Sequence, residues 1–294
     1  MEKVDLEKVR KTLKMTNYPV NLVLEMCSVC NLRCIMCPYP DMKRPRGYMG
    51  KELYEKIINE ISLNSPKDTT LWFAFMGEPL LHTAIFSRIE YAKKKGIENL
   101  YLNTNATMVN PDVADTLKNS GIDKIFVSVD AFKNETYGKI KGVPAAALDI
   151  IEEKIEHLLD ASLDVTVQFI SMPENEAEEE NFKNLWMKRG IRVKVRRALG
   201  WGGNIETVPP KTKRDIPCPW LMRQMIILWD GCVAQCDGDY EGDYSPGDIN
   251  DSTIYEVWQH KLHDLRKRHI EGDYNFEPCK NCSDWSVGLS ELYE

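Results

Sequence analysis

Between about Val20 and Leu199 the chain repeats one pattern, in which a short β-rich run is followed by an amphipathic helical stretch. The β-rich runs predict strands at Val20–Glu25, Thr70–Phe75, Asn99–Thr104, Lys124–Val129, Asp164–Ile170 and Ile191–Arg197. Apolar residues at helical spacing predict helices at Lys51–Leu63, Ala84–Lys95, Pro111–Asn119, Ala147–Asp160 and Glu176–Arg189. Such alternation predicts an α/β fold, with a parallel sheet that is wrapped by helices and is open or partly closed like a barrel. Its site is expected at the carboxyl ends of the strands.

Glycine residues and a change in composition mark the boundaries of this pattern. Gly96, Gly121 and Gly190 each follow a helical stretch and precede a strand, where a left-handed residue that ends a helix belongs. After Trp201–Gly203 the alternation stops, and the remaining segment is rich in Cys, Trp, Asp and Gly. We therefore divide the chain into an N-terminal extension at 1–19, a core at 20–204 and a smaller module at 205–294.

The first of two cysteine sets follows the first predicted strand and consists of Cys30, Cys34 and Cys37. These residues lie on a loop at the carboxyl end of that strand, which is the expected edge for a site. Three thiolates are one ligand short of a closed zinc site or of an ordinary four-cysteine iron–sulfur cluster. The set suggests a cluster with one open iron, where a small molecule can bind and be reduced. The alternative is a zinc or redox-thiol site, to which Cys27 could add a fourth ligand.

The charge balance and the absence of long apolar runs narrow the function classes. The formal net charge is -7, which disfavours a nucleic-acid reader, and five histidines leave little room for a histidine-rich metal site. The start of the chain lacks the apolar stretch of a signal peptide, and no run reaches the ~18 apolar residues of a membrane span. We therefore expect a cytoplasmic protein with no membrane partner. In that compartment the nine cysteines favour metal ligands or reactive thiols over disulfides.

The CxxxCxxC spacing of the first set resembles that of the radical S-adenosylmethionine (SAM) enzymes, and the resemblance covers most of the chain. It implies a partial (β/α)6 barrel whose three cysteines hold a 4Fe–4S cluster, with SAM chelating the fourth iron. In that family an electron from the cluster cleaves SAM to a 5′-deoxyadenosyl radical, which removes a hydrogen atom from the substrate. The resemblance also implies a flavodoxin- or ferredoxin-type electron donor. The cofactor performs the difficult chemistry, and the protein orients the reacting groups and excludes water.

The segment that ends the second predicted strand, Phe75-Met76-Gly77-Glu78-Pro79, resembles the family's GGEP motif with Met76 in place of the first glycine. The resemblance implies that Gly77, Glu78 and Pro79 receive the SAM ammonium group, through backbone carbonyls and an acidic side chain. The alternative is a glutamate that only caps a helix.

Polar residues also end the third and fourth predicted strands. The resemblance places Asn105, Ser128 and Asp130 at the positions that hold the ribose and the carboxylate of SAM. Met36 comes just before the last cysteine of the set, at the position whose side chain usually flanks adenine, and a polarizable methionine can pack on a ring edge. The alternatives are a serine that caps a helix and a methionine that belongs to the core.

Four cysteines of the C-terminal segment form the second set, and four thiolates are enough to close a site. Their spacing resembles the SPASM and shorter twitch extensions of radical SAM enzymes, which bind auxiliary iron–sulfur clusters. The full SPASM pattern carries further cysteines after its last CxxC, and this chain has none beyond Cys282. The resemblance therefore implies one auxiliary 4Fe–4S cluster, with a zinc ribbon as the alternative. The implied ligands are Cys218, Cys236, Cys279 and Cys282.

Two cysteines belong to neither set. Cys27 is expected to pack near the first loop as a small apolar residue. Cys232 lies close in sequence to Cys236 and leaves three alternatives open: core packing, an alternative cluster ligand, or a catalytic thiol that returns a hydrogen atom to a substrate radical.

The size of the chain and its single auxiliary set resemble the compact carbohydrate-modifying members of the family, such as the 2-deoxy-scyllo-inosamine dehydrogenase of butirosin biosynthesis. The resemblance implies dehydrogenation or epimerisation of a sugar, cyclitol or aminoglycoside-type alcohol. The first alternative is modification of a ribosomally made peptide, and a non-catalytic iron–sulfur or zinc scaffold is a distant third. Polar candidates without an assigned role at the barrel mouth are Gln168, Arg196, Arg197 and Asn204.

Overall fold

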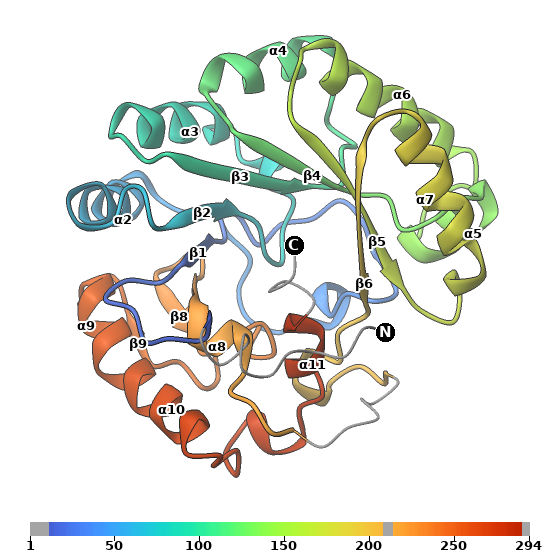
Figure 1. The fold of residues 1–294 in the computed structure, drawn as a ribbon. Coiled ribbons are helices and arrows are strands. Elements are labelled where there is room, and N and C mark those ends of the chain that lie inside the picture. The colour runs from blue at the N-terminus through green and yellow to red at the C-terminus, as the bar shows by residue number, and fades with distance from the viewer. Residues whose placement is uncertain (1–11, 208–213, 290–294) are drawn as a thin grey trace.

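The structure is a computed structural model that describes residues 12–207 and 214–289. Its centre is one nine-stranded sheet with the strand order β6-β5-β4-β3-β2-β1-β7-β8-β9. Strands β1 to β6 pair in parallel, and they curve into a partial barrel with helices on the outer face (Figure 1). The predicted α/β fold with a helix-wrapped parallel sheet is confirmed.

The six parallel strands coincide closely with the predicted ones, because their β-branched and aromatic residues form short uninterrupted runs. Their register places Leu24 beside Phe73 and Phe73 beside Leu102, so the carboxyl ends meet at one edge. The strands are β1 (Asn21–Leu24), β2 (Thr70–Phe73), β3 (Asn99–Thr104), β4 (Lys124–Ser128), β5 (Val165–Ser171) and β6 (Arg192–Arg197).

The helices between these strands also follow the predicted order, with one exception. Helix α5 (Asn134–Lys141) lies between β4 and the next helix, where we predicted none. It is short and contains Gly138, a poor helix former, so its local signal is weak. The helices that were predicted are α2 (Lys51–Asn64), α3 (Ile85–Lys94), α4 (Pro111–Ser120), α6 (Ala147–Asp160) and α7 (Glu179–Lys188).

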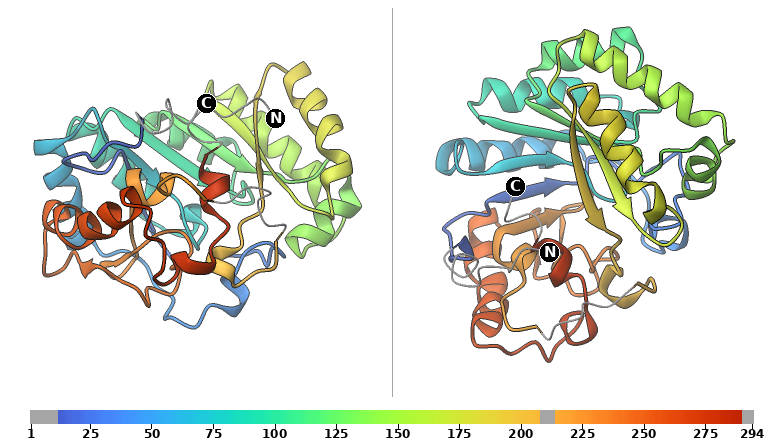
Figure 2. Two further views of the ribbon diagram at one scale, coloured as in Figure 1. Left: turned by 60° about the horizontal axis from the view of Figure 1, so that its bottom comes forward. Right: turned by 45° about the vertical axis from the view of Figure 1, so that its right-hand side comes forward.

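The C-terminal segment extends the same sheet rather than forming a sheet of its own. Strand β7 (Gln224–Ile227) pairs in parallel with β1, and β8 (Cys232–Ala234) and β9 (Gly247–Asp248) continue in antiparallel pairs. The segment lies across the open side of the partial barrel, between β1 and β6 (Figures 1 and 2). Its helices are α8 (Pro219–Arg223), α9 (Ile254–Gln259), α10 (Lys261–Ile270) and α11 (Trp285–Gly288).

The two faces of the barrel strands differ in burial. On the outer face, apolar residues such as Leu71 and Leu100 are fully buried under the helices, and each is worth about 1.5–3 kcal/mol of burial. On the inner face, Trp72, Tyr101 and Phe126 pack against one another with ring centroids 4.9–5.9 Å apart, and Trp72 and Tyr101 stay partly accessible while Phe126 is buried. A cavity remains in the interior at the carboxyl ends of the strands.

Glycine residues end three of the helical stretches as predicted. Gly121 is the C-cap of α4 and has a φ of 84°, a left-handed value that costs glycine little. Gly96 and Gly190 follow α3 and α7 at φ values of 86° and 76°. Within residues 12–207 and 214–289, none of the helices combines the length and the apolar character needed to cross a bilayer.

Candidate active site and second cysteine site

The three cysteines of the first set face one cavity at the carboxyl ends of the parallel strands. The same cavity is lined by every residue that the sequence assigned to SAM except Pro79, which begins the short helix behind it. The remaining walls come from other strand ends and from the 3-10 turn η4 (Trp201–Gly203). The residues that add to the predicted set are Leu32, Phe75, Met76, Asn103, Thr104, Lys141, Ile170, Arg196, Leu199 and Trp201.

The loop that carries these cysteines is held by backbone hydrogen bonds to α5. Arg33 N donates to the carbonyl of Lys141 at 3.4 Å, and Ile35 N donates to that of Ile140 at 3.0 Å. Within the loop, Cys37 N donates to the carbonyl of Cys34 at 3.1 Å. A helix that the sequence did not reveal thus supports the loop on which the chemistry depends.

The thiols themselves fit an iron–sulfur cluster with an open corner. None of the three forms a disulfide. Burial raises the pKa of Cys30 and of Cys34, and burial together with the neighbouring Cys34 and Cys30 raises the pKa of Cys37 to about 12. Thiols in this setting ionise only when a metal replaces the proton, so three converging sulfurs match a site built for cluster iron.

Glu78 is a buried carboxylate that organises the strand ends around the cavity. Its Oε1 accepts hydrogen bonds from Thr104 Oγ1 at 2.7 Å and from Leu80 N at 3.1 Å, and its Oε2 accepts from Asn105 N at 2.8 Å. Burial raises its pKa, and these donors work against that shift. The carboxylate therefore has a positioning role in addition to any contact with an ammonium group.

Gly77 has no room for a side chain, because a Cβ there would lie 2.0 Å from the carbonyl oxygen of Cys27. Gly77→Ala must displace the backbone beside the cluster loop, and we expect a loss of about 1–3 kcal/mol of stability together with weaker SAM binding. Urea unfolding and SAM titration by electron paramagnetic resonance (EPR) measure the two effects. The matched control is Gly50→Ala, whose nearest contact would be 3.9 Å away. Equal effects of the two substitutions would contradict the expectation.

Asn105 and Ser128 contribute polar side chains to the cavity wall from the ends of the neighbouring strands β3 and β4. Asn105 Nδ2 donates to Asn31 Oδ1 at 3.0 Å, which ties the end of β3 to the cluster loop. Ser128 Oγ donates to Gln168 Oε1 at a long 3.4 Å. Asn103 Oδ1, also in this wall, is buried and has no hydrogen-bond partner among the described residues. A buried acceptor without a hydrogen-bond partner fits a ligand that carries a hydrogen-bond donor.

Asp130 is paired with Lys141, a residue that the sequence analysis missed. Lys141 Nζ lies 2.5 Å from Asp130 Oδ2, and both side chains are almost completely buried. Asp130 Oδ1 also accepts from Ile170 N at 2.7 Å. Burial opposes the charge of Lys141, but Asp130 and Cys34 raise its pKa above the usual value. No local signal indicated Lys141, because it lies on the unpredicted helix α5.

Met36 is buried and lines the cavity. Its side chain packs with Ile140 and Met172. Its carbonyl accepts a hydrogen bond from Trp201 Nε1 at 2.9 Å. Trp201 lies in the Trp-Gly-Gly segment that marked the end of the predicted core, so a sequence signal was present but was read only as a boundary.

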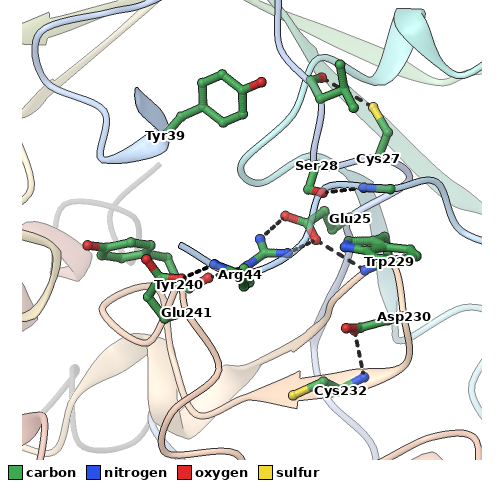
Figure 3. A network of polar contacts seen from close by, with 12 residues as sticks. Glu25, Cys27, Ser28, Tyr39, Arg44, Trp229, Asp230, Cys232, Tyr240 and Glu241 are labelled. Carbon is green, nitrogen blue, oxygen red and sulfur yellow. Dashed lines mark hydrogen bonds and ion pairs between the residues drawn. The ribbon is translucent and has the colours of Figure 1, made fainter. Parts of the chain in front are cut away.

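A buried ion pair joins the region after the cluster loop to the C-terminal segment (Figure 3). Arg44 pairs with Glu25 at the end of β1, and Arg44 Nε donates to the carbonyl of Tyr240 at 2.6 Å. The Glu241 carboxylate accepts from Arg44 N at 2.9 Å, and the Glu25 carboxylate accepts from Trp229 N at 3.2 Å. These contacts hold the two parts of the chain together on the side of the cavity near Cys37.

The four cysteines of the second set also line a shared cavity. Burial and the neighbouring Cys279, Cys218 and Cys282 raise the pKa of Cys236 well above its usual range. Asp284 N donates to Cys282 Sγ at 3.3 Å, the kind of N–H···S contact that tunes cluster cysteines.

Both cysteine sets have to be compared with a single-metal site. The described residues contain no three His, Cys, Asp or Glu side chains spaced to hold one metal ion. A 4Fe–4S cluster instead spreads its cysteine ligands over separate irons. Each set lines a shared cavity, which is compatible with a cluster of that kind.

Neutral His269 supports Cys218, since Cys218 N donates to His269 Nδ1 at 3.3 Å. Burial, together with Arg214 and Arg268, lowers the pKa of His269 to about 3, below its unfolded value of about 6.5. The unfolded chain therefore binds the extra proton, and this stability is present above about pH 6.5 and is lost as pH falls toward 3. Between pH 7 and pH 5 we expect the free energy of unfolding in urea to fall by about 2 kcal/mol more in the wild type than in His269→Gln. Equal falls in the two proteins would contradict the assignment.

The two cysteines outside the sets occupy different environments. Cys27 is buried, as predicted for a small apolar residue, and its thiol donates to the carbonyl of Glu78 at 3.1 Å. Cys232 is half-buried and packs against the apolar cluster that includes Val23 and Ile226. It is not among the residues that line either cysteine cavity, whereas Phe75 packs on that cluster and also lines the first cavity.

Two family models match the chain. Residues 24–185 match the radical SAM superfamily, and residues 218–283 match the SPASM iron–sulfur cluster-binding domain. A tungsten-containing aldehyde ferredoxin oxidoreductase cofactor-modifying protein from Pyrococcus furiosus is 28% identical over 311 residues, covering 89% of this chain and 86% of that protein. A probable GTP 3′,8-cyclase from Saccharolobus islandicus is 29% identical over 176 residues, covering 59% of this chain and 54% of that protein.

Solved structures share the fold at low sequence identity. BtrN in complex with AdoMet and 2-DOIA has a TM-score of 0.66 at 21% identity, covering 92% of this chain and 94% of that one. Native anSMEcpe with bound AdoMet has a TM-score of 0.61 at 18% identity, covering 92% and 88%. SuiB from Streptococcus suis bound to the precursor peptide SuiA has a TM-score of 0.59 at 14% identity, covering 96% and 74%.

Proposed function

The chain belongs to the radical SAM superfamily, and on that basis we propose that it removes a hydrogen atom from a carbinol carbon of a sugar, cyclitol or aminoglycoside-type alcohol. Its cofactors are SAM and 4Fe–4S clusters, one of them auxiliary in the SPASM domain. When bound, SAM and its cluster supply a 5′-deoxyadenosyl radical. The reaction takes place in the cytoplasm with a flavodoxin- or ferredoxin-type electron donor.

The residues of the first cavity then have distinct tasks. Cys30, Cys34 and Cys37 hold the cluster and leave one corner for SAM. Gly77, Glu78 and Pro79 would receive the ammonium group of SAM, where charge-assisted hydrogen bonds give direction as well as affinity. Asn105, Ser128 and Asp130 with its partner Lys141 would hold the ribose and the carboxylate, and Met36 would flank adenine.

One observation carries the proposal: the two cysteine cavities lie on either side of the Gly200–Gly203 segment. Trp201 lines the first cavity, and a Cβ on Gly202 would lie 3.0 Å from the carbonyl oxygen of Gly238, which lines the second. A redox site so near the reaction cavity suits a net oxidation of the substrate. The fold shared with BtrN in complex with AdoMet and 2-DOIA supports the same class of substrate.

The proposal is tested with anaerobic protein, SAM, a reductant and candidate cyclitols deuterated at the carbinol carbon. We expect deuterium in 5′-deoxyadenosine, and a product with either a new carbonyl or an inverted carbinol centre by mass spectrometry and NMR. A product with neither change would refute the proposal. Formation of 5′-deoxyadenosine would also exclude the non-catalytic scaffold.

Between the two outcomes, the position of Cys232 favours dehydrogenation. Burial raises the pKa of its thiol, so the proton stays on sulfur near neutral pH, but the side chain does not line the cavity. We expect Cys232→Ala to form product within about twofold of the wild-type rate, because no thiol is needed to return a hydrogen atom. Cys27→Ala is the control. A variant that still cleaves SAM but forms no product would instead identify Cys232 as the catalytic hydrogen donor of an epimerase.

A second candidate function, modification of a peptide, is favoured by a cleft of about 770 Å³ beside Met36. The cleft includes Ser171 and Arg197 from the ends of β5 and β6, and Ser283 from the C-terminal segment. Strand β6 is at the edge of the sheet, and an extended peptide can add to an edge strand. Co-expression with a short peptide encoded by a neighbouring gene, followed by mass spectrometry of that peptide, distinguishes this function from the first.

A further inference from the structure

The Gly200–Gly203 segment is the wall between the two cysteine cavities. Its tryptophan lines the first cavity, while the backbone of Gly202 touches that of Gly238 in the second. A Cβ on Gly238 would lie 2.9 Å from Gly202 N, so the two backbones meet without a side chain between them. A shift of this segment must therefore change both cavities.

Asp284 holds the wall from the side of the second cavity. Its carboxylate is buried and accepts hydrogen bonds from Gly200 N at 2.6 Å and from Gly202 N at 3.0 Å. Its own backbone N–H donates to Cys282 Sγ at 3.3 Å. One residue thus contacts a sulfur of the second set and fixes both backbone groups that flank Trp201.

Trp201 is held in a backbone conformation that a bulky residue adopts at a cost. Its φ is 50°, in the left-handed region, where tryptophan is an outlier that the surroundings must stabilise. The indole is fixed at its edge, because Nε1 donates to the carbonyl of Met36 at 2.9 Å. Its ring meets that of Tyr240 edge-on, with centroids 6.2 Å apart and an interplanar angle of 88°. An apolar ring is thereby presented to the reaction cavity in one orientation.

We infer that Trp201 is a positioning residue for the substrate and that Asp284 sets its place. This inference rests on the proposed function. The indole surface offers a flat apolar wall against which the C–H face of a sugar or cyclitol ring packs. A substrate seated there shares the cavity with the polar side chains of Asn103 and Arg196, which suit its hydroxyl groups.

Binding is measured first, on protein that carries clusters and SAM but is not reduced, so that no turnover occurs. Isothermal titration calorimetry uses 2-deoxy-scyllo-inosamine as the probe. We expect Trp201→Ala to raise the Kd at least tenfold and Trp201→Phe, which keeps an aromatic wall, to raise it less than threefold. Asp284→Ala should resemble Trp201→Ala, while Asp264→Ala, at an exposed site on α10, should change nothing.

Turnover and spectroscopy separate positioning from a general structural role. After reduction, Trp201→Ala should raise KM for the probe and form 5′-deoxyadenosine in excess over product, with the iron content and the SAM-induced EPR change of the wild type. An unchanged Kd and KM, or a loss of clusters or of the SAM response in Trp201→Ala, would overturn the inference alone. If the wild type cleaves SAM but neither binds nor converts the probe or related carbinols, the proposed function fails and the inference fails with it.

Discussion

Replacing Cys34 by alanine is expected to abolish SAM cleavage, with a loss of 5′-deoxyadenosine formation of roughly 10³-fold or more. Cys34 is one of three thiols that converge on the first cavity, and the pKa shifts of these thiols indicate sulfurs that lose their protons only to a metal. With only two thiolates left, the first set cannot hold a cluster whose fourth iron binds SAM. Iron should fall from about eight to about four atoms per chain, because the second set retains its cluster.

The control for this variant is Cys27→Ala, which removes a nearby buried thiol outside the cavity. It should keep its iron, its SAM-induced EPR change and its activity. A Cys34→Ala protein that still binds about eight irons and still responds to SAM would contradict the assignment of the open corner. Loss of iron in Cys27→Ala as well would show that the substitution disturbs the loop rather than the ligand set.

Replacing Lys141 by methionine is expected to lower the free energy of unfolding by about 3–5 kcal/mol, because it leaves the buried Asp130 carboxylate without its counter-charge. The pair is separated by 2.5 Å and is almost fully buried. The loss should be accompanied by weaker SAM binding, since Lys141 and Asp130 both line the first cavity. Urea unfolding of anaerobically reconstituted protein measures the first effect, and EPR titration with SAM measures the second.

A double-mutant cycle separates the charge from the size of the side chain. Asp130→Asn combined with Lys141→Met removes both charges and keeps an acceptor for Ile170 N, so most of the stability should return. Lys139→Met, on the exposed face of the same helix, is the matched control and should change stability by less than about 0.5 kcal/mol. A double variant as unstable as Lys141→Met would show that the charge pair is not the cause.

The elements with strong local signals could be predicted because their determinants are close together in the sequence. Strand β3 and helix α6 appear with the predicted bounds, since alternation and helical periodicity arise from neighbouring residues. Helix α5 could not be predicted, because it is short and contains Gly138. Its stability comes from tertiary contacts, among them those with the cluster loop.

Contacts between distant segments decide which of the candidate residues reach the cavity. Asn105 and Ser128 lie at the cavity as expected, but Cys232 does not, although it is close in sequence to Cys236. Its strand turns the side chain into an apolar cluster beside β1, a placement that depends on the pairing of β7 with β1. Sequence proximity carries no information about such long-range pairing.

By itself the sequence determined the βα alternation, both cysteine sets and the motif positions, because each depends on spacing within a short segment. Only the tertiary structure decided that Lys141 neutralises Asp130, that Asp284 holds Trp201, and that the C-terminal strands extend the barrel sheet. The physical reason is that a charge can be buried, or a cavity closed, at a favourable free energy only when residues from remote parts of the chain supply the counter-charge or the hydrogen bonds. Which residues do so is determined by the packing of the whole chain.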